Sequence, residues 1–276
     1  MPTLRSGQAS LHYEVHGSGP PILFAHESTG QCESWLPQVE HFARRHTCIL
    51  YNARGYPPSD APADPNAYSQ AIFVADMLAM LDGLKIERAH IVGLSMGSMT
   101  ALHFGLRHPS RATSIVLAGT GPGQSRAAVE VFKTGVLALA GKLDGEGWNA
   151  ILEEYDSAPD RRALRWKNPA LHRAYCAALR ARNGALSALI LRQVVGERPV
   201  LAELAAELRA MDVPVLIATG DADDDCLPTS LFLKETLPHA GLAVFPRTGH
   251  AVNLEEPAVF NSLVEAFHAS VTDGRW

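Results

Sequence analysis

The stretch HIVGLSMGSMTALHFGL, residues 90–106, places one serine between two glycines where a strand-like pattern gives way to a helical one. A sharp strand-to-helix turn needs glycines where its two arms crowd each other. It also holds the central serine in a strained conformation with the hydroxyl exposed. Gly93-Leu94-Ser95-Met96-Gly97 fits that requirement. Because a five-residue motif also arises by chance as a simple tight turn, the rest of the chain must decide between the two interpretations.

The composition is that of a globular enzyme rather than a nucleic-acid-binding protein. The 276 residues allow one large α/β domain or two small ones, with a sizeable core. Hydrophobic residues make up 47% of the chain and charged residues 19%. A net charge of -5 and a pI near 6.2 provide no concentrated basic face to neutralise phosphates. We therefore expect a small-molecule substrate and no nucleic-acid partner.

The sequence shows no targeting or membrane-spanning pattern. The first residues, MPTLRSGQASLHYEVHG, contain no apolar stretch of the kind found in signal sequences, and no segment approaches the ~18 apolar residues of a membrane span. The four cysteines form no C-x-x-C pair, so free thiols are expected: Cys32, Cys48, Cys176 and Cys226. These features predict a cytoplasmic protein with no metal site and no membrane partner. A homodimer is an open hypothesis.

Short apolar runs rich in β-branched residues alternate with helical patterns along most of the chain, as in strands that are covered on both faces. The runs occupy residues 21–26, 46–52, 89–94, 112–119, 213–220 and 241–246. The helical patterns occupy residues 34–45, 69–83, 97–108, 229–237 and 256–270. The alternation predicts an α/β fold with a mostly parallel, twisted sheet flanked by helices. The period-two pattern of residues 4–19 predicts an antiparallel hairpin at the sheet edge.

The alternation stops between Pro122 and Val200, where helix formers and aromatic residues occur without a convincing strand. We interpret residues 122–200 as a helical insertion, a cap or lid, on a core made of residues 1–121 and 201–276. The insertion should lie over the carboxyl ends of the strands, where open α/β sheets bind ligands. Trp148 and Trp166 are candidates for lining the pocket beneath it, and packing within the insertion is the alternative.

A serine hydroxyl becomes a strong nucleophile only when a base removes its proton and an acid orients that base. On the predicted fold, the acid and then a histidine should follow Ser95, each after a later strand. His250 comes just after the last predicted strand, between a glycine and a helix start, so we predict that it is the base. The amide of Met96, the residue after the nucleophile, is the predicted donor to an oxyanion, and the loop after residues 21–26 should supply a second.

The position of the acid is less well defined, because four aspartates crowd the turn after residues 213–220: Asp221, Asp223, Asp224 and Asp225. Such a cluster is also typical of a loop or helix cap. A calcium loop is disfavoured, since the glycine and terminal glutamate of that motif are missing. The turn after residues 112–119 holds no acid before Glu130, which removes the main competing position.

In these features the chain resembles the α/β-hydrolase superfamily over nearly its full length. The matching segments are PPILFAHESTGQCESWLPQ (20–38), YNARGYPPSDAP (51–62), AHIVGLSMGSMTALHFGLRHPSRATSIVLAGTG (89–121), PVLIATGDADDDCLP (214–228) and RTGHAVNLEEPAVFNSLVEAF (247–267). The chain is most similar to small capped esterases, enol-lactonases and carbon-carbon bond hydrolases. The resemblance implies a triad of Ser95, Asp223 and His250, with the Ser28 amide as second oxyanion donor. Spacing measured back from Pro228 would favour Asp224 instead.

Two positions depart from the pattern of the superfamily. His26-Glu27 replaces the usual His-Gly, and Asn52 replaces an aspartate before Arg54-Gly55. If Glu27 faces the pocket, its charge would repel a substrate carboxylate. A solvent-facing carboxylate or a structural pair with Arg54 is the alternative interpretation of Glu27.

The sequence thus predicts a serine-dependent hydrolase that acts on a small ester, lactone or related carbonyl compound through an acyl-enzyme. No metal or organic cofactor is expected, because the triad and two amides supply the nucleophile, the base and the oxyanion stabilisation. Carbon-carbon hydrolysis of a ring-cleavage diketone and cofactor-free peroxidation are alternatives on the same fold. A non-catalytic small-molecule receptor is the alternative from a different class.

Overall fold

One eight-stranded sheet organises the chain, and the computed structural model describes it together with every other residue, 1–276. The strands lie in the order β1-β2-β4-β3-β5-β6-β7-β8. Strands β3 to β8 pair in parallel, whereas β1 and β2 form an antiparallel hairpin at one edge. Their bounds are β1 Thr3–Ser6, β2 Ala9–His16, β3 Pro21–Ala25, β4 Thr47–Tyr51, β5 Ala89–Leu94, β6 Ala112–Ala118, β7 Val215–Gly220 and β8 Ala240–Phe245.

Two separate hydrophobic clusters cover the two faces of this sheet. In β5, Ile91 belongs to one cluster and its neighbour Val92 to the other, and Ile115 and Val116 divide in the same way in β6. Successive side chains of a strand point to opposite faces, so a strand that is covered on both sides reads as an unbroken apolar run. This is the physical reason why the parallel strands could be predicted from the sequence.

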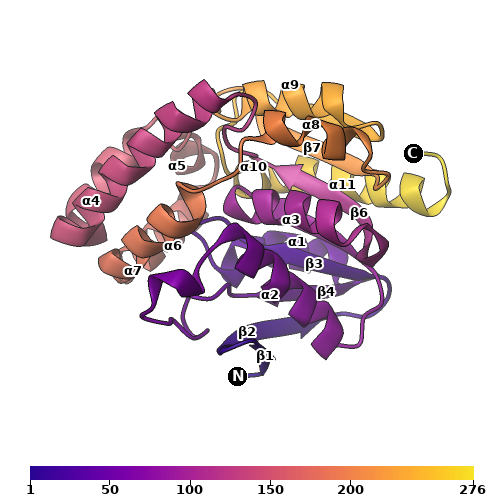
Figure 1. Ribbon diagram of the computed structural model, residues 1–276, viewed down its shortest axis with the longest axis horizontal. Coiled ribbons are helices and arrows are strands. Elements are labelled where there is room, and N and C mark those ends of the chain that lie inside the picture. Colours follow the sequence, from indigo (N-terminus) through magenta and orange to yellow (C-terminus); the bar gives the residue numbers. More distant parts are fainter.

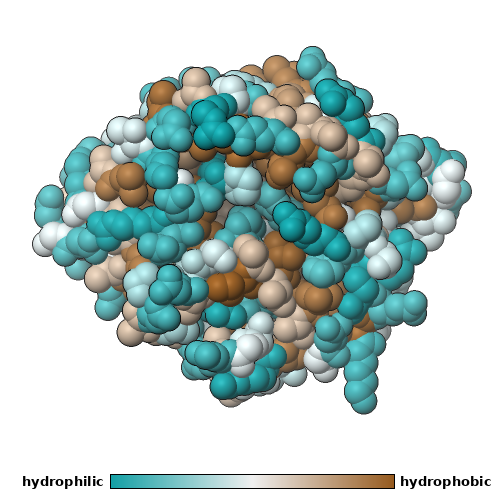
Figure 2. Space-filling model, in the orientation of Figure 1, coloured by the Kyte–Doolittle hydropathy of each residue, from teal (hydrophilic) through white to brown (hydrophobic).

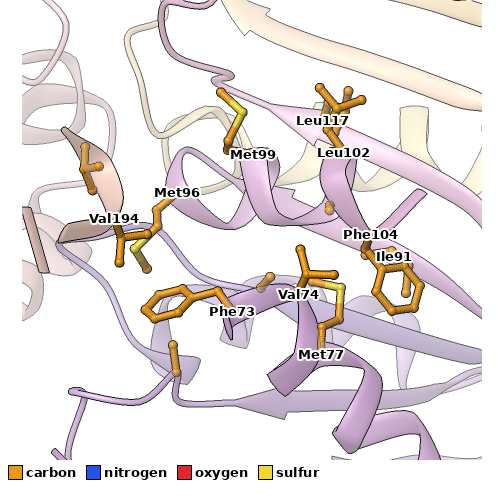
Figure 3. Close-up of a cluster of buried hydrophobic side chains, with 14 of the residues drawn as sticks. Phe73, Val74, Met77, Ile91, Met96, Met99, Leu102, Phe104, Leu117 and Val194 are labelled. Carbon is orange, nitrogen blue, oxygen red and sulfur yellow. The ribbon is translucent and has the colours of Figure 1, made fainter. Parts of the chain in front are cut away.

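Helices form the two outer layers (Figure 1). Helices α2, α3 and α9 contribute to the first cluster and α1 and α11 to the second. Figure 3 shows part of the first cluster, to which α2 contributes Phe73, Val74 and Met77 and α3 contributes Met99 and Phe104. The bounds of the helices outside residues 122–200 are α1 Leu36–Phe42, α2 Gln70–Gly83, α3 Met96–Arg107, α8 Ala205–Arg209, α9 Leu227–Thr236, α10 Val252–Glu255 and α11 Pro257–Thr272. The prediction of an α/β fold with a mostly parallel sheet and flanking helices is confirmed.

Between β6 and β7 the chain forms helices and no strand. Four of these helices, α4 to α7, lie together to one side of the sheet, at the left of Figure 1. Their bounds are α4 Arg126–Ser157, α5 Ala163–Lys167, α6 Pro169–Arg180 and α7 Gly184–Ile190, followed by a π-helix, Leu191–Val195. Gly147 interrupts α4 with a φ of 69°, a conformation that glycine adopts without strain. The division into core and cap remains a prediction.

The surface mixes hydrophilic and hydrophobic residues on the face drawn in Figure 2. None of the helices is both long and apolar enough to cross a membrane. The homodimer remains a prediction.

A buried histidine in α3 makes the stability of the fold depend on pH. His103 is buried, its Nε2 has no hydrogen-bond partner, and burial lowers its pKa to about 4. Between about pH 6.5 and about pH 4 the unfolded chain binds a proton at this histidine that the folded chain does not, so stability falls as the pH falls. We expect His103→Leu to remove this contribution.

The difference in unfolding free energy between the wild type and His103→Leu should therefore change by up to about 1.4 kcal/mol per pH unit within that window. As the pH falls, the wild type should lose stability relative to the variant. Urea denaturation of both proteins at about pH 7.5 and about pH 5.5 measures it. A difference that is the same at both pH values would contradict the prediction.

Candidate active site

Ser95 occupies the turn between β5 and α3 in a strained conformation, with φ 55° and ψ -113°. Glycine is required on both sides of the motif, because any side chain there would collide with backbone atoms. A Cβ on Gly93 would lie 2.2 Å from the carbonyl oxygen of Gly97, and a Cβ on Gly97 would lie 2.1 Å from that of Ala25. The Ser95 amide donates to the carbonyl oxygen of Ala118 at the end of β6 (2.8 Å). The motif therefore forms the predicted strand-to-helix turn.

His250 and Asp223 form a buried pair on the loops after β8 and β7. The Nδ1 atom of His250 lies 2.7 Å from Oδ2 of Asp223, which is the distance of a strong charge-assisted hydrogen bond. Burial alone would raise the pKa of Asp223, but the charge and hydrogen bond of His250 and the Cys226 thiol hold that pKa below its usual value. Asp224 and Asp225 are exposed beside it. The structure thus brings Asp223, and neither neighbour, to the histidine.

The loop that carries His250 is held from several directions. The carboxylate of Glu255 accepts hydrogen bonds from the amides of Gly249 (2.7 Å) and Ala251 (3.3 Å), on either side of the histidine. The carbonyl oxygen of Asp160, in the helical insertion, accepts from the His250 amide (2.7 Å). Asp221, another aspartate of the cluster, accepts from the amide of Thr248 (3.1 Å). These contacts fix the position of the backbone that carries the imidazole ring.

A cavity of about 580 Å³ lies against these residues. Ser95, His250 and Asp223 all line it, and the helical insertion contributes residues such as Phe132 and Tyr155. The Nε2 atom of His250 is buried without a hydrogen-bond partner, so it is free to take a proton from a hydroxyl group. The cavity is therefore a candidate active site between the strand ends and the insertion.

Two backbone amides are available as oxyanion donors. Met96 is the first residue of α3, so its amide has no acceptor in a preceding helical turn. The Ser28 amide makes no hydrogen bond within the protein, and Ser28 lines the same cavity as Ser95. The carbonyl group of Ser28 is held by the Tyr56 hydroxyl (2.9 Å) and by Nη1 of Arg182 (2.9 Å). These contacts orient the peptide between Ser28 and Thr29, which directly follows the Ser28 amide in the chain.

Glu27 occupies none of the predicted environments. It is buried rather than solvent-facing, it does not line the cavity, and its Oε1 accepts a hydrogen bond from the Ser34 hydroxyl (2.9 Å). Arg54 instead pairs with Asp76 of α2, with 2.7 Å between Nε and Oδ2. Burial raises the pKa of Glu27, which favours its uncharged form. The hypothesis that Glu27 repels a substrate carboxylate in the pocket is therefore wrong for this geometry.

The two tryptophans proposed for the pocket lie elsewhere. Trp148 is buried within the helical insertion, where its Nε1 donates to the Ser187 hydroxyl (3.0 Å) and its ring meets Tyr155. Trp166 is 52% exposed at the surface. Neither lines the cavity. This geometry fits the packing alternative for Trp148, whose buried N–H finds its hydrogen-bond acceptor in Ser187 of the same insertion.

Sequence reasoning missed several residues at the site. Arg161 and Arg198 of the helical insertion line the cavity, and Glu255 holds the histidine loop. Glu255 carried one signal, because an acid in the first turn of a helix often binds nearby amides. The arginines carried none, because the sequence does not distinguish an arginine at a cavity from one on the outer surface.

Three clusters of side chains could in principle offer ligands to a metal. One is Asp223, Cys226 and His250, but the Nδ1 atom of His250 is already bonded to Asp223. In a second, Asp156 already binds Arg165 and His172. The third contains Glu14, which binds His16. In each cluster at least one of these side chains is already bonded to another side chain of the protein.

Residues 20–257 match the α/β hydrolase fold family. The chain belongs to that family and is a hydrolase, so the receptor hypothesis is set aside.

Among named relatives, the chain is 29% identical over 262 residues to 2-hydroxymuconate semialdehyde hydrolase of Pseudomonas sp., covering 92% of this chain and 85% of that protein. It is 25% identical over 275 residues to 3-oxoadipate enol-lactonase 2 of Acinetobacter baylyi, covering 96% and 95%. The crystal structure of the enol-lactonase from Burkholderia xenovorans superposes with a TM-score of 0.84, at 23% identity over 97% of this chain and 100% of the other. That structure supports the fold alone.

Proposed function

We propose that the protein is a serine-dependent hydrolase of a small ester, lactone or related carbonyl compound that works through an acyl-enzyme. The observation that carries this proposal is the buried Asp223–His250 pair, joined at 2.7 Å, on the same cavity as the strained Ser95. The named relatives, a lactonase and a carbon-carbon hydrolase, are consistent with chemistry at a carbonyl carbon.

In the proposed mechanism, Nε2 of His250 takes the proton of Ser95 as its Oγ attacks the substrate carbonyl carbon. Asp223 holds the Nδ1–H tautomer and stabilises the imidazolium ion that forms. The amides of Met96 and Ser28 donate to the oxyanion of the tetrahedral intermediate. The imidazolium ion then protonates the leaving group. In the second half of the reaction His250 takes a proton from water as the water oxygen attacks the acyl carbon, and the imidazolium ion returns that proton to Oγ of Ser95 as the acid product leaves. We propose that residues 122–200 act as the cap that shields this site from bulk water.

Burst kinetics test the proposal. An acyl-enzyme predicts that 4-nitrophenyl acetate releases about one equivalent of nitrophenol rapidly and then turns over steadily. A fluorophosphonate should add once per chain, on the peptide that carries Ser95, as measured by mass spectrometry. Stoichiometric labelling of a different residue would remove Ser95 from the mechanism. Activity on a ring-cleavage diketone in the same preparation would favour the carbon-carbon alternative.

A further inference from the structure

One arginine of the helical insertion reaches the candidate active site without a partner. Arg198 lies between the π-helix Leu191–Val195 and α8, lines the cavity, and is only 8% exposed. Its guanidinium group packs on the ring of Phe132, 4.0 Å from the ring centroid, and its Nε donates to the carbonyl oxygen of Val195 (3.0 Å). Nη1 is buried and has no hydrogen-bond acceptor among the protein's own atoms.

Two other pairs of charged or ionisable groups line the cavity, and the carboxylates of Asp224 and Asp225 line it without an ion-pair partner. Arg161 pairs with Asp160, with 2.8 Å between Nε and Oδ2, and Asp223 is bonded to His250. The charge of Asp225 is near enough to raise the pKa of Arg198 slightly, but no carboxylate lies within ion-pair distance of this guanidinium group. Although Asp225 is exposed as a whole residue, partial burial of its carboxyl group raises its pKa, and the charge of Asp223 raises that pKa further, which weakens Asp225 as a counter-ion. Arg198 is therefore the cation of the cavity that lacks a carboxylate.

The guanidinium group lies directly against the backbone of Gly121. A Cβ on Gly121 would lie 2.1 Å from Nη1, so the arginine uses space that only a glycine leaves open. Burial lowers the pKa of Arg198 to about 10, so the group is still charged at neutral pH. A buried guanidinium N–H without an acceptor is unfavourable, and a ligand carboxylate relieves this with a charge-assisted hydrogen bond.

The location is within reach of the nucleophile. Ala118 accepts the Ser95 amide hydrogen bond (2.8 Å), and Gly121, which contacts Arg198, is three residues further along the chain. Three residues span at most about 11 Å. A short acyl chain with a terminal carboxylate can therefore extend from the Ser95 hydroxyl toward the guanidinium group.

We propose that Arg198 binds a carboxylate carried by the substrate, so that the enzyme selects anionic esters or lactones over neutral ones. This inference rests on the proposed function for the reaction and adds the class of substrate. It also reverses the selectivity that a pocket-facing Glu27 would have produced.

Matched pairs of esters test the inference. The anionic substrates are the mono-4-nitrophenyl esters of adipate and suberate, and the neutral partners are their methyl esters. We expect Arg198→Gln to lower the ratio of kcat/KM for anionic over neutral substrates by about 10- to 100-fold, mainly through KM. Arg198→Lys should recover part of the ratio. Arg126→Gln, an equal charge change at an exposed position that pairs with Glu203, should leave the ratio unchanged.

Inhibition of the wild-type protein gives a second measurement that does not depend on folding of a variant. Adipate should inhibit hydrolysis of 4-nitrophenyl acetate at least tenfold more strongly than adipamide, as expected for one charge-assisted contact of about 1.4 kcal/mol or more. Equal inhibition by the two compounds, or a substrate ratio that Arg198→Gln leaves within about twofold, would overturn the inference.

Failure of the subsite and failure of the proposed function give different results. If Ser95→Ala abolishes hydrolysis of every ester while Arg198→Gln leaves the ratio unchanged, the mechanism stands and the carboxylate subsite does not. If Ser95→Ala remains active, the mechanism fails, and calorimetric binding of adipate to wild type and to Arg198→Gln still decides whether the subsite exists.

Discussion

Replacing Ser95 with alanine is expected to lower kcat for 4-nitrophenyl acetate by about five to six orders of magnitude, the range seen when a serine hydrolase loses its nucleophile. In the proposed mechanism His250 acts as the base and does not replace the missing Oγ as nucleophile. Residual hydrolysis would come from the oxyanion donors and from substrate binding. Steady-state assays measure the effect, with enough enzyme to detect the residual hydrolysis.

The fold should survive this substitution. Ser95 makes no side-chain hydrogen bond at the start of α3, and its backbone has a positive φ that disfavours any residue with a Cβ. We therefore expect the melting temperature of Ser95→Ala to lie within a few degrees of that of the wild type. Gly97→Ala is the contrasting variant, because its Cβ would collide with the backbone of Ala25, and it should lower stability. Normal activity in folded Ser95→Ala would exclude the proposed nucleophile.

Much of this fold could be predicted because its signals are local. The helix predicted at residues 69–83 is α2, Gln70–Gly83, whose first turn is capped by the Ser69 hydroxyl. The strand at residues 89–94 is β5 with the same bounds. For the site, the turn around Ser95 and the position of His250 after the last strand depend on the same short-range patterns. The order of the elements then brings them to one end of the sheet.

The predictions that failed depended on contacts between distant segments. Arg54 was proposed as a partner for Glu27, but its partner Asp76 lies 22 residues along the chain, on α2. Glu27 instead bonds Ser34, at the turn before α1, and no periodic pattern specifies that contact. Trp148 is bonded to Ser187, 39 residues later. Such pairs follow from tertiary packing within the insertion and around the strand ends, which sequence patterns do not determine.

The choice between neighbouring aspartates was open for a related reason. Asp223, Asp224 and Asp225 have the same chemistry, and the direction of each side chain depends on the backbone of one turn. In the structure the Asp223 amide bonds back to the carbonyl oxygen of Gly220 (3.3 Å) and its carboxylate turns inward to His250. This geometry supports Asp223 as the acid of the proposed triad.

Replacing Asp223 with asparagine is expected to lower kcat by about 10⁴-fold, as the equivalent change does in a serine-protease triad. The amide removes the negative charge that stabilises the imidazolium ion. Its NH₂ group can also donate to Nδ1, which leaves the proton on Nε2, so His250 can no longer accept the proton of Ser95. Steady-state assays and thermal melting of the variant measure activity and folding side by side.

Asp224→Asn and Asp225→Asn are the matched controls, because both residues lie in the same turn, are more exposed than Asp223, and make no hydrogen bond to His250. Each should lose tenfold or less in kcat/KM, which corresponds to about 1.4 kcal/mol of transition-state stabilisation. Fluorophosphonate labelling should slow in Asp223→Asn and remain fast in both controls, since it reports the reactivity of Ser95 without product release. If Asp224→Asn is the crippled variant and Asp223→Asn is nearly normal, the acid is the neighbouring residue, and the turn must rearrange in solution to bring Asp224 to Nδ1 of His250.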